Sequence, residues 1–196
     1  MTERQHAIPI VLAEGKYLRF MQRAGWEYAE RRGVTGIVGI VAVTDEGKLL
    51  LVEQYRPPLN KRVVELPAGL VGDEARQESE SLLAAANREL QEETGYHAGN
   101  LSLLASGPTS AGMCSEVIML CYATKLQKLN EGGGGEGEAI VIHEIPLSEV
   151  TLRLQEWINE GKLVDLKVYA AQHFAATQNL GGGCGIPHDS SEAPLL

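Results

Sequence analysis

Residues 80–96 read ESLLAAANRELQEETGY, and this stretch decides the fold. Its centre is rich in leucine and alanine, which are strong helix formers, and Gly95 stands where a glycine commonly ends a helix. The pattern predicts a helix over residues 80–94. At about 100° per residue, Glu89 and Glu93 lie one turn apart on an otherwise apolar face of that helix.

The same helix carries more negative charge than an ordinary surface helix. Carboxylates at positions i and i+4 repel each other, and near a helix C-terminus they also oppose the helix dipole. The helix contains no lysine that would neutralise them. One interpretation is a solvated acidic helix end. The other is a site for a divalent cation, because Mg²⁺ prefers carboxylate oxygens and bridges them to phosphates.

The chain before the helix is predicted mainly as strands. Val34–Thr44 and Lys48–Gln54 flank Asp45-Glu46-Gly47, whose glycine suits a tight turn, so we expect a hairpin. Gly36 and Gly39 weaken the first of these strands and could mark a bulge.

The chain after the helix is predicted to form strands and loops before it ends in helices. The expected elements are strands at Leu101–Ala105, Val117–Ala123 and Ala139–Ile145, a flexible acidic loop at Glu131–Glu138, and helices at Leu147–Glu160 and Val164–Thr177. This order favours a mixed α+β domain over a regular βαβ array. We expect an N-terminal strand extension over residues 1–33, the main domain over 34–180 and a disordered tail over 181–196.

Charge and composition argue against several classes of protein. The formal net charge is −9, and the longest basic groupings are Arg31-Arg32 and Lys61-Arg62, which disfavours binding to nucleic acid. No run of about 18 apolar residues could span a membrane, and the N-terminus lacks the apolar core of a signal peptide. Three widely spaced cysteines without a CxxC motif favour a reducing, cytoplasmic environment.

The helix also matches a known signature. The arrangement Glu80-x7-Arg88-Glu89-Leu90-x-Glu92-Glu93-x-Gly95-Tyr96 resembles the Nudix box, G-x5-E-x7-R-E-U-x-E-E-x-G-U. The front of the box differs, because ten residues rather than five separate Gly69 from Glu80. We interpret this difference as a longer loop ahead of the helix, where an insertion costs little.

The resemblance implies a fold and a set of metal ligands. The implied fold is a Nudix-type α/β/α sandwich with a mixed β-sheet and an N-terminal strand extension used in dimerisation. Glu89 and Glu93 match the metal-binding carboxylates of the family, with the Ala68 carbonyl and Glu138 as further ligands. The implied metal is Mg²⁺, with Mn²⁺ as a second possibility. The positions that match supporting residues of the box are Gly69, Glu80, Arg88 and Gly95.

Two glutamates are assigned to catalysis by the same resemblance. Glu136, in the acidic loop, matches the general base that activates water, and its role could be exchanged with that of Glu138. Glu92 matches either a metal ligand or a hydrogen-bond partner of Arg88. The alternative for the loop is a solvated linker.

Outside the box, the sequence is similar to the ADP-ribose pyrophosphatase branch of the family. The matching stretches are WEYAER at 26–31, QYRPP at 54–58, ELPAG at 65–69 and VDLK at 164–167. The resemblance implies that Trp26, Glu27, Arg31 and Arg56 contact substrate. Arginine forks suit a diphosphate, and an indole face suits a purine. Packing of the tryptophan and surface ion pairs of the arginines are the alternatives.

These observations predict an enzyme that hydrolyses ADP-ribose to AMP and ribose 5-phosphate with Mg²⁺. The branch typically has a proline where this chain has Ala111, which leaves the group beyond the second phosphate less defined. Another nucleoside diphosphate sugar, such as GDP-mannose, is the alternative substrate. A non-catalytic Nudix domain that senses nucleotide is the alternative function. The expected assembly is a homodimer in which the N-terminal strands are exchanged.

Overall fold

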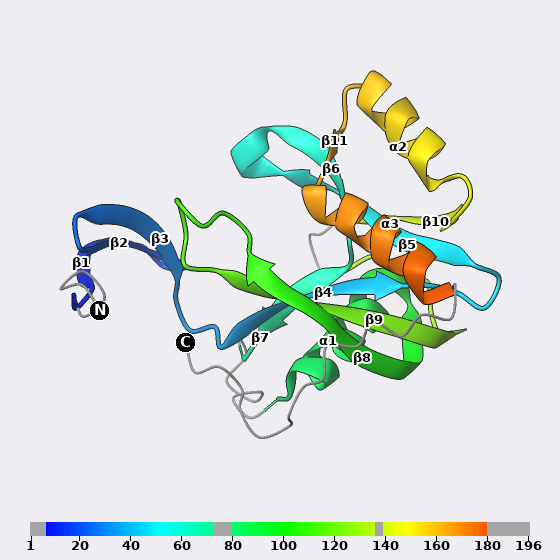
Figure 1. Ribbon diagram of the computed structural model, residues 1–196, viewed down its shortest axis with the longest axis horizontal. Coiled ribbons are helices and arrows are strands. Elements are labelled where there is room, and N and C mark those ends of the chain that lie inside the picture. Colours follow the sequence, from blue (N-terminus) through cyan, green and yellow to red (C-terminus); the bar gives the residue numbers. More distant parts are fainter. Residues whose placement is uncertain (1–6, 73–79, 136–138, 180–196) are drawn as a thin grey trace.

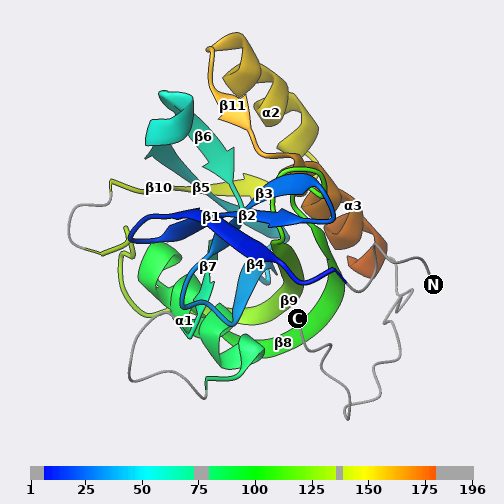
Figure 2. The ribbon, with the colours of Figure 1, turned by 90° about the vertical axis from the view of Figure 1, so that its left-hand side faces the viewer.

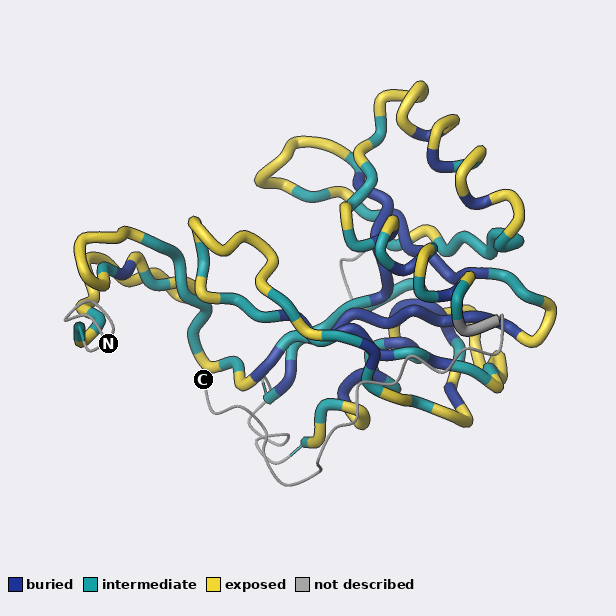
Figure 3. The backbone as a smooth tube through the Cα atoms, viewed as in Figure 1, coloured by how far each residue is buried: buried dark blue, intermediate teal, exposed yellow. Residues whose placement is uncertain are grey.

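The computed structural model describes residues 7–72, 80–135 and 139–179. Its N-terminal part is a separate antiparallel sheet with the order β1-β2-β3. These strands are β1 (Ile10–Glu14), β2 (Leu18–Arg23) and β3 (Trp26–Arg31). The sheet projects from one end of the molecule, and most of its residues are exposed or half-buried (Figures 1 and 3).

Two four-stranded mixed sheets form the centre of the main body. The first has the order β7-β4-β9-β8, with β4 (Gly36–Ala42), β7 (Ala68–Val71), β8 (Tyr96–Pro108) and β9 (Val117–Lys128). The second has the order β10-β5-β6-β11, with β5 (Lys48–Arg56), β6 (Lys61–Glu65), β10 (Val141–Pro146) and β11 (Leu163–Val164). In each sheet one pair of strands is parallel, β4 with β9 and β6 with β11.

Helices cover both sides of these sheets, and each side has its own apolar core. Helix α1 (Leu82–Thr94) packs through Ala85, Ala86 and Leu90 on residues of β4, β7 and β9. Helices α2 (Val150–Asn159) and α3 (Leu166–Asn179) close the other core, in which Trp157 is fully buried. Figure 2 shows α1 apart from α2 and α3. The predicted α/β/α arrangement with mixed sheets is therefore confirmed.

The predicted hairpin around residues 45–47 is wrong. The turn itself forms, and Val43 meets Leu49 in an isolated bridge, but β4 then pairs with β7 and β9 while β5 pairs with β6 and β10. Both strands are apolar on both faces, with Val38, Ile40 and Val41 fully buried in β4. Each therefore needs partners on both of its edges, which a two-stranded hairpin would not provide.

The proposed bulge in β4 is also wrong. The register of β4 runs residue by residue along both of its partners. Gly39 is instead a site of close packing, because a Cβ there would lie 3.1 Å from the Leu120 side chain. A glycine inside a strand marks such a close approach as often as a bulge.

The predicted helices all form, with boundaries shifted by a few residues. For α1, Ser81 is the N-cap and accepts a hydrogen bond from the Ala84 amide, while Gly95 ends the helix with φ of 78°. Of the strands predicted after α1, β8 and β9 are longer than predicted, whereas β10 is one residue shorter and begins two residues later. No helix within the described ranges is long and apolar enough to cross a membrane.

Candidate active site

The candidate site lies where α1 meets the start of β7. The backbone amide of Ala68 donates a hydrogen bond to Glu93 Oε2 at 3.0 Å. A Cβ at Gly69 would overlap the Glu89 side chain, so only glycine allows this approach of helix to strand. Both carboxylates therefore reach the backbone of one strand, because they stand one turn apart on the buried side of α1.

Arg88 bridges the carboxylates around this contact. Its guanidinium donates to Glu80 at 3.2 Å, to Glu89 Oε1 at 2.8 Å, to Glu92 Oε2 at 3.2 Å and to the Leu70 carbonyl at 3.2 Å. We call Glu80, Arg88, Glu89, Glu92 and Glu93 the box cluster. Burial would lower the pKa of Arg88, but the hydrogen bonds and charges of Glu80 and Glu89 raise it.

Within the described residues, the carboxylates of the box cluster share a cation. One guanidinium, that of Arg88, contacts three of them. The Glu93 residue is only 8% exposed, and 13% of the Glu89 side chain is exposed, whereas 55% of the Glu92 side chain is exposed. Glu92 thus lies off the face that meets β7.

The donor chemistry of this site fits Mg²⁺. Among the described residues, no three His, Cys, Asp or Glu side chains converge as a complete metal site. However, Mg²⁺ is usually held by one or two carboxylates, and waters and substrate phosphates complete its coordination. Glu89, Glu93 and the backbone of Ala68 offer hard oxygen donors of this kind at one place.

Arg56 lies close to the same site and is held by a buried carboxylate. Its Nε and Nη2 atoms donate to the two oxygens of Glu65 at 2.9 and 2.5 Å. Glu65 is 8% exposed. This bidentate hydrogen bond is the main cause that raises the pKa of Arg56, and the charges of Glu93 and Asp165 add to it. Arg56 therefore interacts electrostatically with Glu93, which is one of the metal-binding candidates.

The N-terminal candidates gather at a different place. Trp26, Arg31 and residues of the segment 111–117 line a pocket of about 710 Å³ between β3 and the start of β4. Trp26 is 64% exposed, which excludes packing in the core of its own chain. Arg31 donates to Glu116 Oε1 at 2.9 Å, so it does form an ion pair. Glu27 lies on the same strand and is exposed.

Two candidates of the acidic loop, Glu136 and Glu138, lie outside the described residues. The part of the loop that is described, residues 131–135, contacts the C-terminal end of α1. The start of the predicted flexible loop is therefore hydrogen-bonded to the helix.

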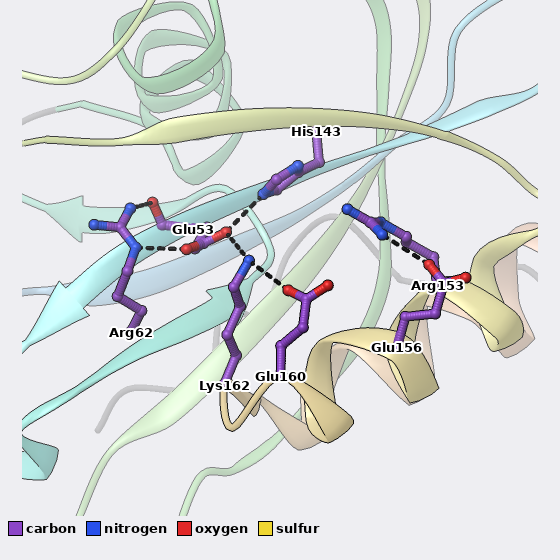
Figure 4. Close-up of polar contacts among 7 residues, drawn as sticks. All are labelled: Glu53, Arg62, His143, Arg153, Glu156, Glu160 and Lys162. Atoms are coloured by element: carbon purple, nitrogen blue, oxygen red, sulfur yellow. Dashed lines mark hydrogen bonds and ion pairs between the residues drawn. The ribbon is translucent and has the colours of Figure 1, made fainter.

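A second charged cluster lies on the other side of the sheets (Figure 4). Glu53 of β5 accepts hydrogen bonds from Arg62, from His143 Nε2 at 3.0 Å and from Lys162 Nζ at 3.1 Å. We call Glu53, Arg62, His143 and Lys162 the Glu53 cluster. Burial would raise the pKa of Glu53, but these hydrogen bonds lower it to about 2. The His143 ring lies 4.6 Å from that of the fully buried Trp157, so this tryptophan is a packing residue.

The roles of Glu65, Glu116 and the Glu53 cluster were not predicted from the sequence. Glu53 follows the apolar run Leu49–Val52, and a carboxylate in such a buried strand was a signal that it must have partners. Its partners come from three other segments, so no spacing could reveal them.

The chain matches known proteins over most of its length. The NUDIX domain model matches residues 35–166. The chain is 37% identical over 144 residues to the methanol dehydrogenase activator of Bacillus methanolicus, which covers 73% of each protein. It is also 37% identical over 147 residues to the ADP-ribose pyrophosphatase of Bacillus subtilis (strain 168), which covers 74% of this chain and 75% of that protein.

A solved structure, the crystal structure of ADP compounds hydrolase, shares the fold with a TM-score of 0.62. The match covers 89% of this chain and 92% of that chain at 21% identity. The α/β/α sandwich, with the box glutamates of α1 placed at the start of β7, defines the class of protein to which this chain belongs. The chain belongs to the Nudix family.

Proposed function

We propose that this chain hydrolyses the pyrophosphate bond of ADP-ribose, giving AMP and ribose 5-phosphate, with Mg²⁺ as cofactor. The observation that carries the proposal is the contact of Glu89 and Glu93 with the backbone of Gly69 and Ala68. The names of relatives such as the Bacillus subtilis enzyme support the choice of substrate. In the reaction, water supplies a hydroxyl to one phosphorus, and a proton goes to the phosphate oxygen that leaves.

Glu89, Glu93 and the Ala68 carbonyl would hold the metal, and Mn²⁺ could replace Mg²⁺. A bound divalent cation would neutralise the diphosphate and stabilise the charge that develops on the leaving oxygen. Arg88 orients Glu89 through the hydrogen bond of 2.8 Å and also contacts Glu92. Glu92 therefore acts through Arg88 or as a further ligand at the exposed edge of the site.

We assign the general base to Glu136 and a further metal ligand to Glu138, on the family resemblance alone. The two assignments could be exchanged. Glu136→Gln and Glu138→Gln would separate them, because loss of a base changes the pH profile of kcat whereas loss of a ligand changes the metal dependence.

Arg56 and Arg31 would bind the diphosphate, Trp26 would stack on the purine, and Glu27 would accept a hydrogen bond from its amine. Arg56 lies near Glu93, but Trp26 stands on the projecting N-terminal sheet (Figure 1). We therefore propose a homodimer in which Trp26 completes the site of the neighbouring subunit. Apolar side chains exposed on the N-terminal strands support it, among them Ile10, Val11 and Phe20.

Mixing two inactive variants tests this exchange. In a heterodimer of Trp26→Ala with Glu93→Gln, one site combines an intact Glu93 with an intact Trp26 from the other subunit. Activity that reappears on mixing supports the exchange. Mixtures no more active than the separate variants would contradict it.

The most useful experiment is a panel of nucleoside diphosphate sugars and nucleoside triphosphates, each with Mg²⁺ and with Mn²⁺. We expect the highest kcat/KM for ADP-ribose. A higher value for GDP-mannose would overturn the choice of substrate, and nucleotide binding without hydrolysis of any compound would favour a sensor.

A regulatory role is the second candidate, because one relative of equal identity is a methanol dehydrogenase activator. The same substrate panel tests the regulatory role, because an enzyme turns over one of the compounds and a purely regulatory protein does not. We place either function in the cytoplasm, in keeping with the cysteine usage described above.

A further inference from the structure

The C-terminal end of α1 is held by a run of glycines from another part of the chain. The Gly133 amide donates to the Glu93 carbonyl at 2.9 Å, and the Gly134 amide donates to the Glu92 carbonyl at 3.1 Å. We call Gly132, Gly133 and Gly134 the glycine clamp. The last carbonyls of a helix have no hydrogen-bond partner within the helix, and these amides supply partners for two of them.

The clamp requires glycine at each position. The φ angles of Gly132, Gly133 and Gly134 are 62°, 107° and 82°, in the region that side chains disfavour. A Cβ at Gly132 would also overlap the backbone of Thr94 and Gly95. The run of glycines therefore has a defined conformation here, and it makes a contact that residues with side chains could not make.

The clamp bonds the backbone of two box glutamates, Glu93, whose side chain faces the site, and Glu92, which lies at its exposed edge. Glu93 is fixed at both ends, its carbonyl by Gly133 and its carboxylate by the Ala68 amide. Glu92 is fixed similarly, its carbonyl by Gly134 and its carboxylate by Arg88. The amides also bring positive dipole ends to a helix terminus that is negative, and so they offset the unfavourable position of the carboxylates.

We propose that the glycine clamp is a positioning element of the metal site, which fixes the last turn of α1 so that Glu93 keeps its alignment with Ala68. This inference rests on the proposed function, because it treats Glu93 as a metal ligand. An ordinary helix cap would contribute to stability alone. A positioning element also sets the affinity for metal when the protein is fully folded.

Alanine substitutions within the one loop give a graded test. Gly132→Ala introduces both an unfavourable φ and a backbone overlap, whereas Gly133→Ala introduces only the unfavourable φ, because a Cβ there meets nothing within 4 Å. Gly135→Ala is the matched control, since Gly135 lies outside the positive-φ region and a Cβ there also meets nothing within 4 Å.

The measurements are the Mn²⁺ dissociation constant from electron paramagnetic resonance, kcat and KM for ADP-ribose, and thermal unfolding. At a temperature where every variant is folded, we expect Gly132→Ala to weaken Mn²⁺ binding and lower kcat by about tenfold or more. Gly133→Ala should show a smaller change of the same kind, about threefold to tenfold. KM should change less than kcat, and Gly135→Ala should match the wild type.

Equal Mn²⁺ affinity in Gly133→Ala, Gly135→Ala and the wild type would overturn the proposal, even if the melting temperature of Gly133→Ala fell. If Gly132→Ala does not fold, Gly133→Ala decides the question, because it introduces no overlap. A wild type that binds Mn²⁺ but does not hydrolyse ADP-ribose would refute the proposed function, and the Mn²⁺ comparison would still decide the clamp.

Discussion

The box cluster lies against β7 of one sheet, the Glu53 cluster lies on β5, β6 and β10 of the other, and among the described residues the two combine charges in opposite ways. In the box cluster one guanidinium, that of Arg88, contacts three carboxylates. In the Glu53 cluster one carboxylate contacts Arg62, Lys162 and His143. Both clusters are partly or wholly buried, so burial alone does not distinguish them.

The difference separates a functional charge cluster from a structural one. A buried carboxylate with several cationic donors is satisfied, and it holds together the segments that supply those donors. A group of carboxylates with too few cations is destabilising by itself, and a divalent cation would remove that repulsion. We therefore expect substitutions in the first cluster to change activity and substitutions in the second to change stability.

The largest effect is expected for Glu93→Gln. A glutamine can still accept the hydrogen bond from the Ala68 amide, so the fold should persist with a melting temperature equal to that of the wild type or higher. Loss of a charged metal ligand should lower kcat by about 10³-fold, which corresponds to roughly 4 kcal/mol of transition-state stabilisation. Steady-state kinetics with ADP-ribose and thermal unfolding without metal measure the two quantities.

Glu156→Gln on α2 is the control, because it removes one exposed carboxylate that pairs with Arg153 far from the box. It should leave kcat unchanged. Turnover by Glu93→Gln at the rate of the wild type would refute the metal assignment.

The next largest effect is expected for Glu53→Gln. This change leaves Arg62 and Lys162 without their shared carboxylate, and it should lower the free energy of unfolding by about 3 kcal/mol. The kcat at a temperature well below unfolding should stay within twofold of the wild type, about the precision of such assays. Urea denaturation and steady-state kinetics test the two statements separately, and a large loss of kcat in folded protein would contradict the distinction between the clusters.

The stabilisation by Glu53 should also depend on pH. Its carboxyl has a pKa of about 2 in the folded chain, against an ordinary value of 4.5. A lowered pKa in the folded state stabilises the protein above the unfolded pKa, and this stabilisation is lost as pH falls through the folded value. The difference in unfolding free energy between wild type and Glu53→Gln should shrink as the pH falls from 4.5 towards 2. A difference that grows on acidification would contradict the assigned cause.

The same contrast explains what the sequence could predict. The box cluster comes mainly from one helix, so helix periodicity and the spacing of Arg88, Glu89 and Glu93 predicted which residues share a face. The Glu53 cluster comes from β5, β6, β10 and the segment after α2, and local patterns do not specify how distant segments meet. The pairing of β4 and β5 was mispredicted for the same reason, because a turn signal is local and sheet order is not.

Residues that act by holding another side chain or helix in place were also hard to predict. Arg56 was identified by its chemistry and by resemblance, whereas Glu65 was not, because its role depends on where β5 and β6 bring the two side chains. The run of glycines was interpreted from composition as a flexible loop. Its hydrogen bonds to α1 depend on tertiary contact, which composition does not specify.

The smallest effect is expected for Glu65→Gln, which changes a residue that belongs to neither cluster. Glu65 holds the Arg56 guanidinium through two hydrogen bonds, and a glutamine oxygen can accept only part of this pattern. Arg56 should then lose its orientation towards the diphosphate, and KM should rise about tenfold, or roughly 1.4 kcal/mol, with little change in kcat. Glu116→Gln provides the matched comparison, because Glu116 holds Arg31 as Glu65 holds Arg56. A KM that changes only in Glu116→Gln would show that Arg31, not Arg56, is the arginine on which substrate binding depends.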